Sequence, residues 1–228
     1  MKYPILIVCL LTLFSCNKKT LLLPEADTCA ITEVNDLSVA YIFYDTNLPD
    51  SVELNKKNLI ISTNWIVNVD KRLSLEQAIP KVEVLQKKRR NASMHKNEKA
   101  REFFACNDTA IKNLGFIDFT GVDYNHSTAD DYLLKAPEIS NTIKVLVTTK
   151  SLEHIEIRIP NDTTETIKTN YTNLSKELNT LSGTIELRKE LVLSFNKKLS
   201  FQDYISVKSQ LSTIDDFNIL LSKQEFIY

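Results

Sequence analysis

The residues best suited to chemistry in this chain of 228 residues are its four cysteines. Cys9 and Cys16 lie near the start of the chain, and Cys29 and Cys106 follow in its polar part. No C-x-x-C spacing occurs, so a redox-active dithiol is not indicated. The thiol of Cys106, with His95 nearby in the sequence, is a first candidate for a nucleophile.

A serine is the second candidate nucleophile. Ser93 and Lys96 have the S-x-x-K spacing of penicillin-binding enzymes,. Ser194 and Lys197 repeat that spacing, and neither pair is accompanied by K-T-G, S-D-N or G-x-S-x-G,. We therefore predict no catalytic residue. An envelope hydrolase that uses Cys106 or Ser93 with His95 stays open as an alternative.

Metal, cofactor and nucleotide sites are not indicated. The three histidines are far apart, and the acidic stretch from Asp118 to Asp131 lacks the alternating pattern and central glycine of a calcium loop,. With three glycines in all, the chain has no glycine-rich phosphate loop,. We predict neither a metal nor a cofactor.

The strongest charge feature lies between residues 86 and 101. Two interpretations are open: a surface for an anionic envelope polymer or an acidic envelope protein, or a solvated helix end whose field Glu98 and Glu102 dilute. The candidate residues, called the basic patch below, are Lys87, Lys88, Arg89, Arg90, Lys96, Lys99 and Arg101.

The N-terminus predicts the location. Lys2 precedes an apolar run from Ile5 to Phe14, which is about half the roughly 20 residues that a membrane-spanning helix needs,. Leu13-Phe14-Ser15-Cys16 resembles the lipobox of bacterial lipoproteins, in which the cysteine is acylated, for example with palmitate, and becomes the first mature residue. We expect a protein held to the membrane by lipid on Cys16, in the outer membrane facing the periplasm. This compartment disfavours nucleic acid as a partner.

The same compartment bears on the two remaining cysteines. In an oxidising periplasm, an isolated pair is most simply a disulfide, so we expect Cys29 and Cys106 to be joined. Such a bond closes a loop of 77 residues and contributes ~3–4 kcal/mol,.

The pattern along the chain predicts an α+β fold. In the N-terminal half, β-formers predict a strand from Ser38 to Tyr44 and a second, near-continuous strand region from Asn58 to Ser62 and from Trp65 to Val69,. Ser74-Leu-Glu-Gln77 is a capping box that opens a helix containing Pro80,. We expect a second helix over 96–107, a strand over 114–119 and mostly loop from Gly121 to Pro137,.

The C-terminal half predicts the order β-β-α-β-α-β. Strands are expected over 142–148 and 154–159, and the second of these alternates strictly between polar and apolar residues, as a strand with one solvated face does,. A helix from Asp162 to Gly183, a strand over 191–195, a helix over 200–211 and a final strand over 217–221 follow,. The expected parts are a signal peptide (1–15), a tether (16–36), an N-terminal αβ domain (37–137) and a C-terminal αβ domain (138–228).

The two halves share an internal match. Val69-Asp-Lys-Arg-Leu-Ser-Leu75 aligns without gaps on Phe195-Asn-Lys-Lys-Leu-Ser-Phe201, at a shift of 126 residues. Both copies have a strand, a polar turn and a capped helix, which suggests a duplicated αβ unit.

The second copy carries a family resemblance. Asn196-Lys-Lys-Leu-Ser-Phe201, between a hydrophobic strand and a helix, resembles the periplasmic domain of the ExbD/TolR family, and the similar order of elements extends over 142–221. The resemblance implies a small periplasmic recognition domain. The family's motor role requires a membrane helix with an embedded aspartate, whereas the apolar segment here is a lipoprotein signal. We predict a non-catalytic binding or accessory module, with an accessory subunit of an envelope transport complex as the alternative.

Overall fold

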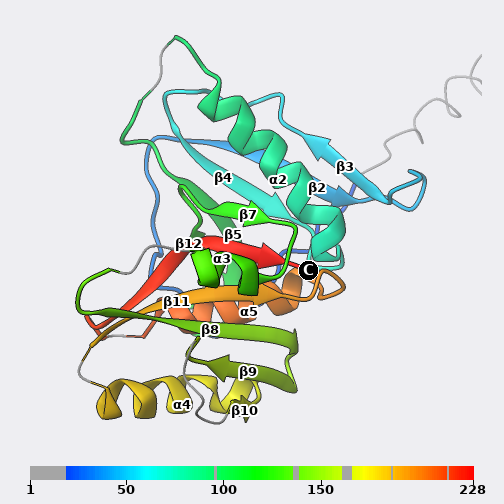
Figure 1. Ribbon diagram of the computed structural model, residues 1–228. Coiled ribbons are helices and arrows are strands. Elements are labelled where there is room, and N and C mark those ends of the chain that lie inside the picture. The colour runs from blue at the N-terminus through cyan, green and yellow to red at the C-terminus, as the bar shows by residue number, and fades with distance from the viewer. Residues whose placement is uncertain (1–18, 95–96, 136–138, 161–165, 186, 215) are drawn as a thin grey trace, which may run out of the picture.

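The computed structural model describes residues 19–94, 97–135, 139–160, 166–185, 187–214 and 216–228. It confirms the α+β class, with two mixed sheets and helices packed on them (Figure 1). Among the described residues, no helix has the length and apolar character needed to cross a membrane.

The first sheet has the order β1-β5-β4-β2-β3, and β6 pairs with the other side of β5. Helix α2 packs on one of its faces. Its elements are β1 (Glu25–Ala26), β2 (Leu37–Tyr44), β3 (Val52–Asn55), β4 (Asn64–Val69), α2 (Leu75–Arg90), β5 (Glu102–Asp108) and β6 (Asn113–Asp118).

The second sheet has the order β10-β9-β8-β11-β12-β7. Helix α3 lies on one face, and α5 lies on the other (Figure 1). Its elements are β7 (Asp123–Asn125), α3 (Ala129–Lys135), β8 (Thr142–Ser151), β9 (His154–Arg158), β10 (Ile167–Thr169), α4 (Tyr171–Thr184), β11 (Arg188–Phe195), α5 (Phe201–Ser212) and β12 (Ile219–Ile227). This sheet begins before the predicted boundary at residue 138, because β7 pairs with β12.

The αβ unit suggested by the sequence match recurs in the structure. In each half an antiparallel hairpin, β2–β3 or β8–β9, is followed by a parallel β-α-β unit, β4-α2-β5 or β11-α5-β12. The neighbours within the sheets also correspond, in the orders β3-β2-β4-β5 and β9-β8-β11-β12.

The two matched turns contact each other. Ser74 and Ser200, which are equivalent at the shift of 126, form an isolated antiparallel bridge. The amide of Leu75 donates to the carbonyl of Leu199 at 2.9 Å, and the equivalent amide of Phe201 donates to the carbonyl of Leu73 at 2.7 Å. Helix starts leave their first amides without partners inside the helix. Here each turn supplies carbonyls to the first amides of the other helix, so the junction has approximate twofold symmetry.

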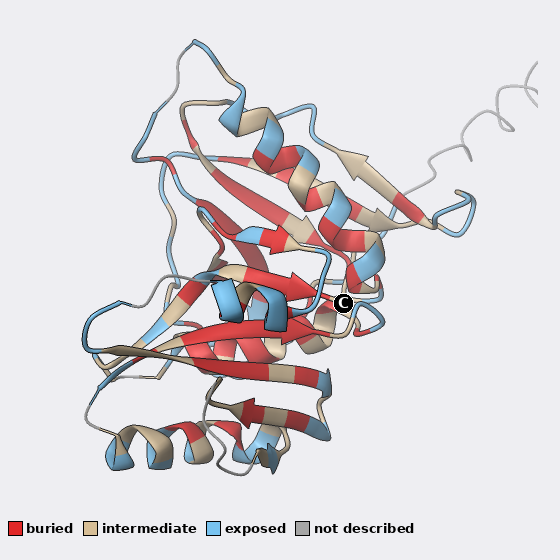
Figure 2. Ribbon diagram, in the orientation of Figure 1, coloured by how far each residue is buried: buried red, intermediate tan, exposed pale blue. Residues whose placement is uncertain are grey.

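One hydrophobic core joins both sheets (Figure 2). The Phe104 ring of β5 stacks on Phe119 with 3.9 Å between centroids, and it meets Phe201 and Tyr204 of α5 edge to face at 5.1 and 6.1 Å. The contacts of Phe104 with Phe201 and Tyr204 connect residues about a hundred positions apart, so α5 packs against the first sheet as well as against its own sheet.

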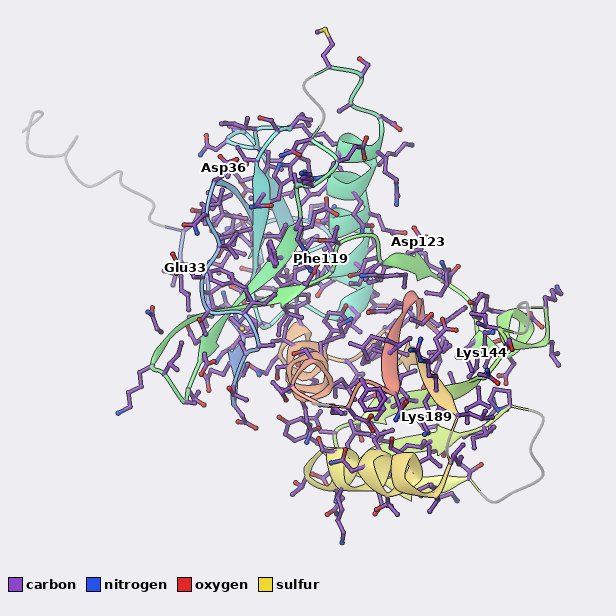
Figure 3. The ribbon with its side chains drawn as sticks, turned by 90° about the vertical axis from the view of Figure 1, so that its left-hand side faces the viewer. Glu33, Asp36, Phe119, Asp123, Lys144 and Lys189 are labelled. Carbon is purple, nitrogen blue, oxygen red and sulfur yellow. The ribbon has the colours of Figure 1, made fainter. Side chains whose placement is uncertain are left out.

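The segment 19–36 was expected to be part of a tether, with order beginning at Ser38, and that expectation is wrong. The amide of Leu22 donates to buried Asp70, β1 pairs with β5, and Ile31 bridges to Phe116. Leu23, Ile31 and Val34 pack against the face of the first sheet opposite α2. The segment, called the strap below, is thus part of the fold, and Glu33 and Asp36 mark its end in Figure 3.

Other differences from the sequence prediction have local causes. The second half of the helix expected over 96–107 is strand β5, in which Phe103 and Phe104 face opposite sides of the sheet instead of one side of a helix. The strand expected over 58–62 is irregular, and the second strand region begins at Asn64 with β4. The helix α4 begins at Tyr171, capped by Asn170, and the expected cap at Asp162 lies outside the described residues. Gly183 lies inside α4 and does not have a positive φ.

Candidate functional site

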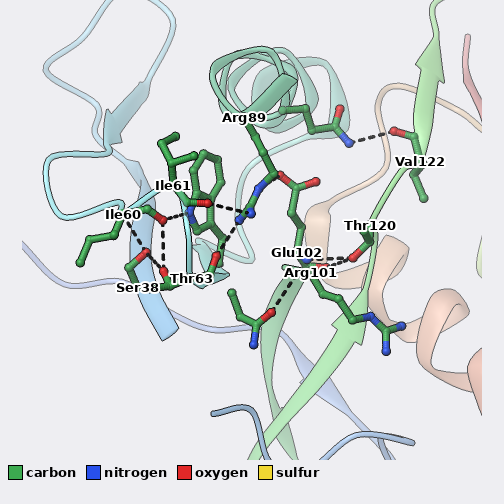
Figure 4. Close-up of polar contacts among 12 residues, drawn as sticks. Ser38, Ile60, Ile61, Thr63, Arg89, Arg101, Glu102, Thr120 and Val122 are labelled. Atoms are coloured by element: carbon green, nitrogen blue, oxygen red, sulfur yellow. Dashed lines mark hydrogen bonds and ion pairs between the residues drawn. The ribbon is translucent and has the colours of Figure 1, made fainter. Parts of the chain in front are cut away.

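The basic patch lies at the C-terminal end of α2 and in the segment that follows, and Arg89 turns inward from it (Figure 4). Its guanidinium lies 4.0 Å from the centroid of the Trp65 ring. Its Nε donates to the Glu102 carboxylate at 3.1 Å, and its other nitrogens donate to the carbonyls of Ile61 and Thr63 at 3.4 and 3.1 Å. Arg89 therefore holds the structure together and is not available to a partner.

The Arg89–Glu102 pair is sheltered from solvent, with side chains 11% and 6% exposed. Burial lowers the pKa of Arg89 and raises the pKa of Glu102, and the attraction between the two charges opposes both shifts,. Each charge needs the other, because an unpaired charge at this depth is strongly unfavourable.

Two further members of the basic patch form ion pairs. Arg90 pairs with Asp123 at 3.3 Å, and Arg101 pairs with Asp118. The predicted patch is therefore corrected: three of the six members that the structure describes are engaged by carboxylates, and Lys96 lies outside the described residues. Among the described members of the patch, no ion pair is found for Lys87, Lys88 and Lys99.

The nucleophile candidates have unfavourable positions. Cys106 is completely buried on β5, and its hydrogen bond with Cys29, together with burial, raises the pKa of its thiol well above the usual range. A substrate has no access to this sulfur in the structure. Ser93 is exposed in the turn after α2, and His95 lies outside the described residues.

The acidic stretch is occupied by ion pairs. Asp118 pairs with Arg101, Asp130 pairs with Arg158, and His126 contacts Glu83 at 3.0 Å. In the part of the chain that the structure describes, no three His, Cys, Asp or Glu side chains gather as a metal site would require.

A buried polar network in the second half was not recognised in the sequence. Lys208 of α5 pairs with Glu225 of β12, and both are almost fully buried. The Tyr204 hydroxyl donates to Glu225 at 2.8 Å and lies 3.3 Å from the Tyr124 hydroxyl. Burial raises the pKa of both tyrosines well above 10. The sequence signal for this network was Lys208, a lysine on the apolar face of α5, but nothing in the sequence identified Glu225 as its partner.

A cavity of about 210 Å³ lies between the start of α3 and the face of the second sheet. We call it the α3 pocket. Its polar lining comes from β8, β9, β11, the start of α3, Thr128 just before it, and Tyr228 just after β12. The side chains that matter below are Asp130, Lys150, Glu156, Arg158, Ser194 and Tyr228.

The charges around the α3 pocket alternate in sign. Lys150 pairs with Glu156 at 2.7 Å, and Arg158 pairs with Asp130. All four side chains are partly exposed, between 31% and 60%, so solvent and ligands can compete for them. Exposed pairs of this kind contribute at most about 1 kcal/mol each, so a ligand can replace either partner at low cost.

Tyr228 is the unusual member of the α3 pocket. Its hydroxyl oxygen is buried and has no hydrogen-bond partner in the structure. Burial raises the pKa of this phenol, Lys150 opposes the shift, and Glu156 adds to it. A buried hydroxyl without a partner costs about 1–3 kcal/mol, so its retention here points to a partner supplied from outside the chain.

The position of the α3 pocket follows from the topology. Thr148, Lys150 and Ser194 lie toward the carboxyl ends of the parallel strands β8 and β11, where open α/β sheets commonly bind ligands,. The sequence showed the alternating polar face of β9. It did not show that α3 covers this face, because α3 was expected to be loop.

Comparison of the chain with protein-family models, curated proteins and solved structures finds no match. The ExbD/TolR resemblance therefore stays a prediction, and the function is argued from the site itself.

Proposed function

We propose that this protein is a lipid-anchored component of the bacterial envelope that acts as a non-catalytic binding module, with the α3 pocket as its ligand site. The observation that carries the proposal is the buried Tyr228 hydroxyl without a partner, placed among two cations and two carboxylates. The basic patch is a weaker candidate, because Arg89, Arg90 and Arg101 are already paired.

The chemistry of the α3 pocket selects a compact zwitterion. A ligand carboxylate takes the place of Asp130 at Arg158 or of Glu156 at Lys150, and a ligand ammonium binds the carboxylate that is released,. The volume, about 210 Å³, is below the 300–1,000 Å³ of most ligand pockets, which favours an amino acid or the end of a short peptide,.

The binding test is a titration of the isotope-labelled protein followed by NMR. L-alanine, D-alanine and glycylglycine are compared with propionate and propylammonium, which each carry one of the two charges. We expect the zwitterions to shift the amide signals of β8, β9 and Tyr228 at millimolar or lower concentration, and the single charges to bind at least tenfold more weakly. Equal binding of propionate would contradict the zwitterion, and no shift with any probe would contradict the site.

A matched pair of tyrosine variants tests the hydroxyl. Tyr228→Phe removes an oxygen without a partner, so we expect unchanged or slightly higher stability together with about tenfold weaker ligand binding,. The control is Tyr41→Phe on β2, away from the α3 pocket, which leaves binding unchanged. Unchanged affinity in Tyr228→Phe would show that the ligand does not use this hydroxyl.

The lipid anchor is tested separately. Cys16→Ser removes the acylation site, so the protein is expected to leave the membrane fraction and to lack the mass of its acyl chains. Cys9→Ser, within the signal segment, is the control and retains both properties. A Cys16→Ser protein that still fractionates with membranes would contradict lipid attachment at this residue.

A second candidate, an accessory subunit of an envelope transport complex, is favoured by an apolar surface at the amino edge of the second sheet. Thr142 and Arg188 are paired there, as are Lys189 and Ile219, so the residues just before these strands lie together. Three exposed apolar residues precede these strands, Ile139, Leu187 and Phe217, and Leu220 at the start of β12 is exposed as well; Phe217 is 83% exposed.

A photo-crosslinking amino acid at Phe217 tests this candidate in intact cells. We expect a crosslink to a transport-complex subunit, identified by mass spectrometry, and none from the same probe at Lys57 on the opposite half. Crosslinks only between copies of the chain would contradict the accessory function.

A further inference from the structure

The strap crosses one end of the β5–β6 hairpin and is held at several points. The amide of Glu25 donates to the side-chain oxygen of Gln202 at 2.9 Å, and the amide of Asn107 donates to the carbonyl of Pro24 at 2.8 Å. Farther along the strap, the amide of Cys29 donates to the buried carboxylate of Asp108 at 2.7 Å. These contacts bring Cys29 against β5.

The two cysteines meet in the interior. Cys29 is 6% exposed and Cys106 is fully buried, and their sulfur atoms lie 2.9 Å apart as two thiols without a disulfide bond between them. Both cysteines belong to the shared hydrophobic core, which shelters them from solvent. Two thiols from segments 77 residues apart are thus held within reach of a covalent bond,.

Gly115 makes this approach sterically feasible. It is the residue of β6 that pairs with Cys106, and a Cβ at this position would lie 2.4 Å from the sulfur of Cys29. The strand therefore leaves open the space that the cysteine of the strap occupies. Because a glycine stands where any larger residue would displace Cys29, the fold is adapted to the contact between the two cysteines.

We propose that Cys29 and Cys106 form a disulfide that fastens the strap, and with it the proposed lipid anchor, to the first sheet. The S–S bond forms as the two thiols lose two protons and two electrons. The electrons reduce the disulfide of an envelope thiol oxidoreductase to its dithiol. The cellular part of this inference rests on the proposed envelope location.

The bond is expected to form before the strap is fully packed. In the folded state the hydrogen bond between the two thiols raises the pKa of the Cys106 thiol, which burial raises further, and lowers the pKa of Cys29,. Both sulfur atoms are buried, so an oxidoreductase reaches neither of them once the strap is packed,. Oxidation therefore accompanies folding, and the finished bond is protected from reductants in the native protein.

The first experiment counts thiols in the full chain. Protein from the envelope is unfolded in guanidinium and alkylated with N-ethylmaleimide, with or without prior reduction. We expect Cys29 and Cys106 to be labelled only after reduction, and a peptide map to show the two joined. Labelling of both without reduction overturns the disulfide in the cell.

A second experiment distinguishes the ability of the two cysteines to form a disulfide from the proposed location of the protein in the envelope. The full chain is refolded in a mixture of reduced and oxidised glutathione. A disulfide formed here, with free thiols in envelope protein, would count against the proposed location and keep the geometric inference. Free thiols in the glutathione mixture as well would overturn the inference itself.

The third experiment asks whether the bond fastens the strap. The protease that cuts after glutamate has an exposed target at Glu33, within the strap. We expect reduced protein and the Cys29→Ala/Cys106→Ala variant to be cut there at least tenfold faster than oxidised protein. Cleavage at Glu153, in the turn between β8 and β9, serves as the internal control and keeps its rate. Equal rates at Glu33 in all three forms overturn the fastening function, and a folded variant is verified by its circular dichroism.

Discussion

At the scale of single residues, Gly115 has the most restrictive surroundings. The sequence contains three glycines, and only Gly115 faces atoms that a methyl group would strike. No pattern in the sequence distinguishes it, because the cause is a cysteine 86 positions away that the fold brings to it. The expected oxidising compartment and the two remaining cysteines predicted that Cys29 and Cys106 would meet, but the glycine that makes room for them emerged only with the structure.

Gly115→Ala is expected to lower the free energy of unfolding by about 2 kcal/mol, because an added methyl group must displace the strap from β6,. Gly183→Ala is the matched control. It adds a methyl group within helix α4, where nothing lies within 4 Å, so stability should rise by up to about 1 kcal/mol,. Urea denaturation measures both changes, and equal effects would contradict the steric explanation.

The Arg89–Glu102 pair gives a second residue-scale prediction. Arg89→Met leaves a buried carboxylate without its partner, so the free energy of unfolding should fall by about 3 kcal/mol at pH 8,. Arg90→Gln, which breaks an exposed pair in the same turn, should change it by less than about 0.5 kcal/mol,.

The loss in Arg89→Met should depend on pH. Burial raises the folded-state pKa of Glu102, and loss of the arginine raises it further,. The penalty is therefore complete above the raised pKa and shrinks as the pH falls toward the ordinary glutamate value of about 4.3, where the carboxyl is neutral in both states. Denaturation at a series of pH values measures this, and a constant difference would contradict a charge-based penalty.

At the scale of elements, the sequence predicts well wherever local chemistry decides. The capping box at Ser74, the strands β8, β9 and β11 and the helix α5 agree with prediction, since each has a clear period or cap. The sequence prediction is wrong for β5, because adjacent phenylalanines are compatible with either a helix or a strand buried on both faces,. Only tertiary packing decides such a segment.

The cap of α5 is expected to contribute measurably. The Ser200 side chain accepts from the amide of Asp203 at 3.1 Å, and the Asp203 carboxylate accepts from the amide of Ser200 at 3.3 Å. Ser200→Ala should lower the free energy of unfolding by about 1 kcal/mol. Ser175→Ala, inside α4, is the control and should have little effect, and thermal melting of both variants tests the difference.

At the scale of the whole molecule, the two recurring units are joined into one structure. Their matched turns exchange backbone hydrogen bonds, and the rings around Phe104 join β5 to α5. The shift of 126 residues indicated two related units. That the matched segments would pair with each other was not predictable, because the match shows likeness and not contact.

We expect the shared core to unfold in one transition. Trp65, the single tryptophan, is fully buried in the first sheet, so its fluorescence reports on that half, whereas circular dichroism reports on both,. The two signals should give the same midpoint in urea. Separate midpoints would show that the halves unfold independently.

The packed strap also limits how far the folded protein can extend from its proposed lipid anchor. Lys19 already pairs with Asp45 and Glu53 beside the β2–β3 hairpin. Three peptide steps separate it from Cys16, and an extended chain covers at most about 11 Å over that length. With lipid on Cys16, as proposed, the folded body rests at the bilayer surface with this hairpin toward the headgroups. In that arrangement, partners and ligands are bound close to the membrane surface, because the segment between Cys16 and Lys19 is too short to let the folded part move far from it.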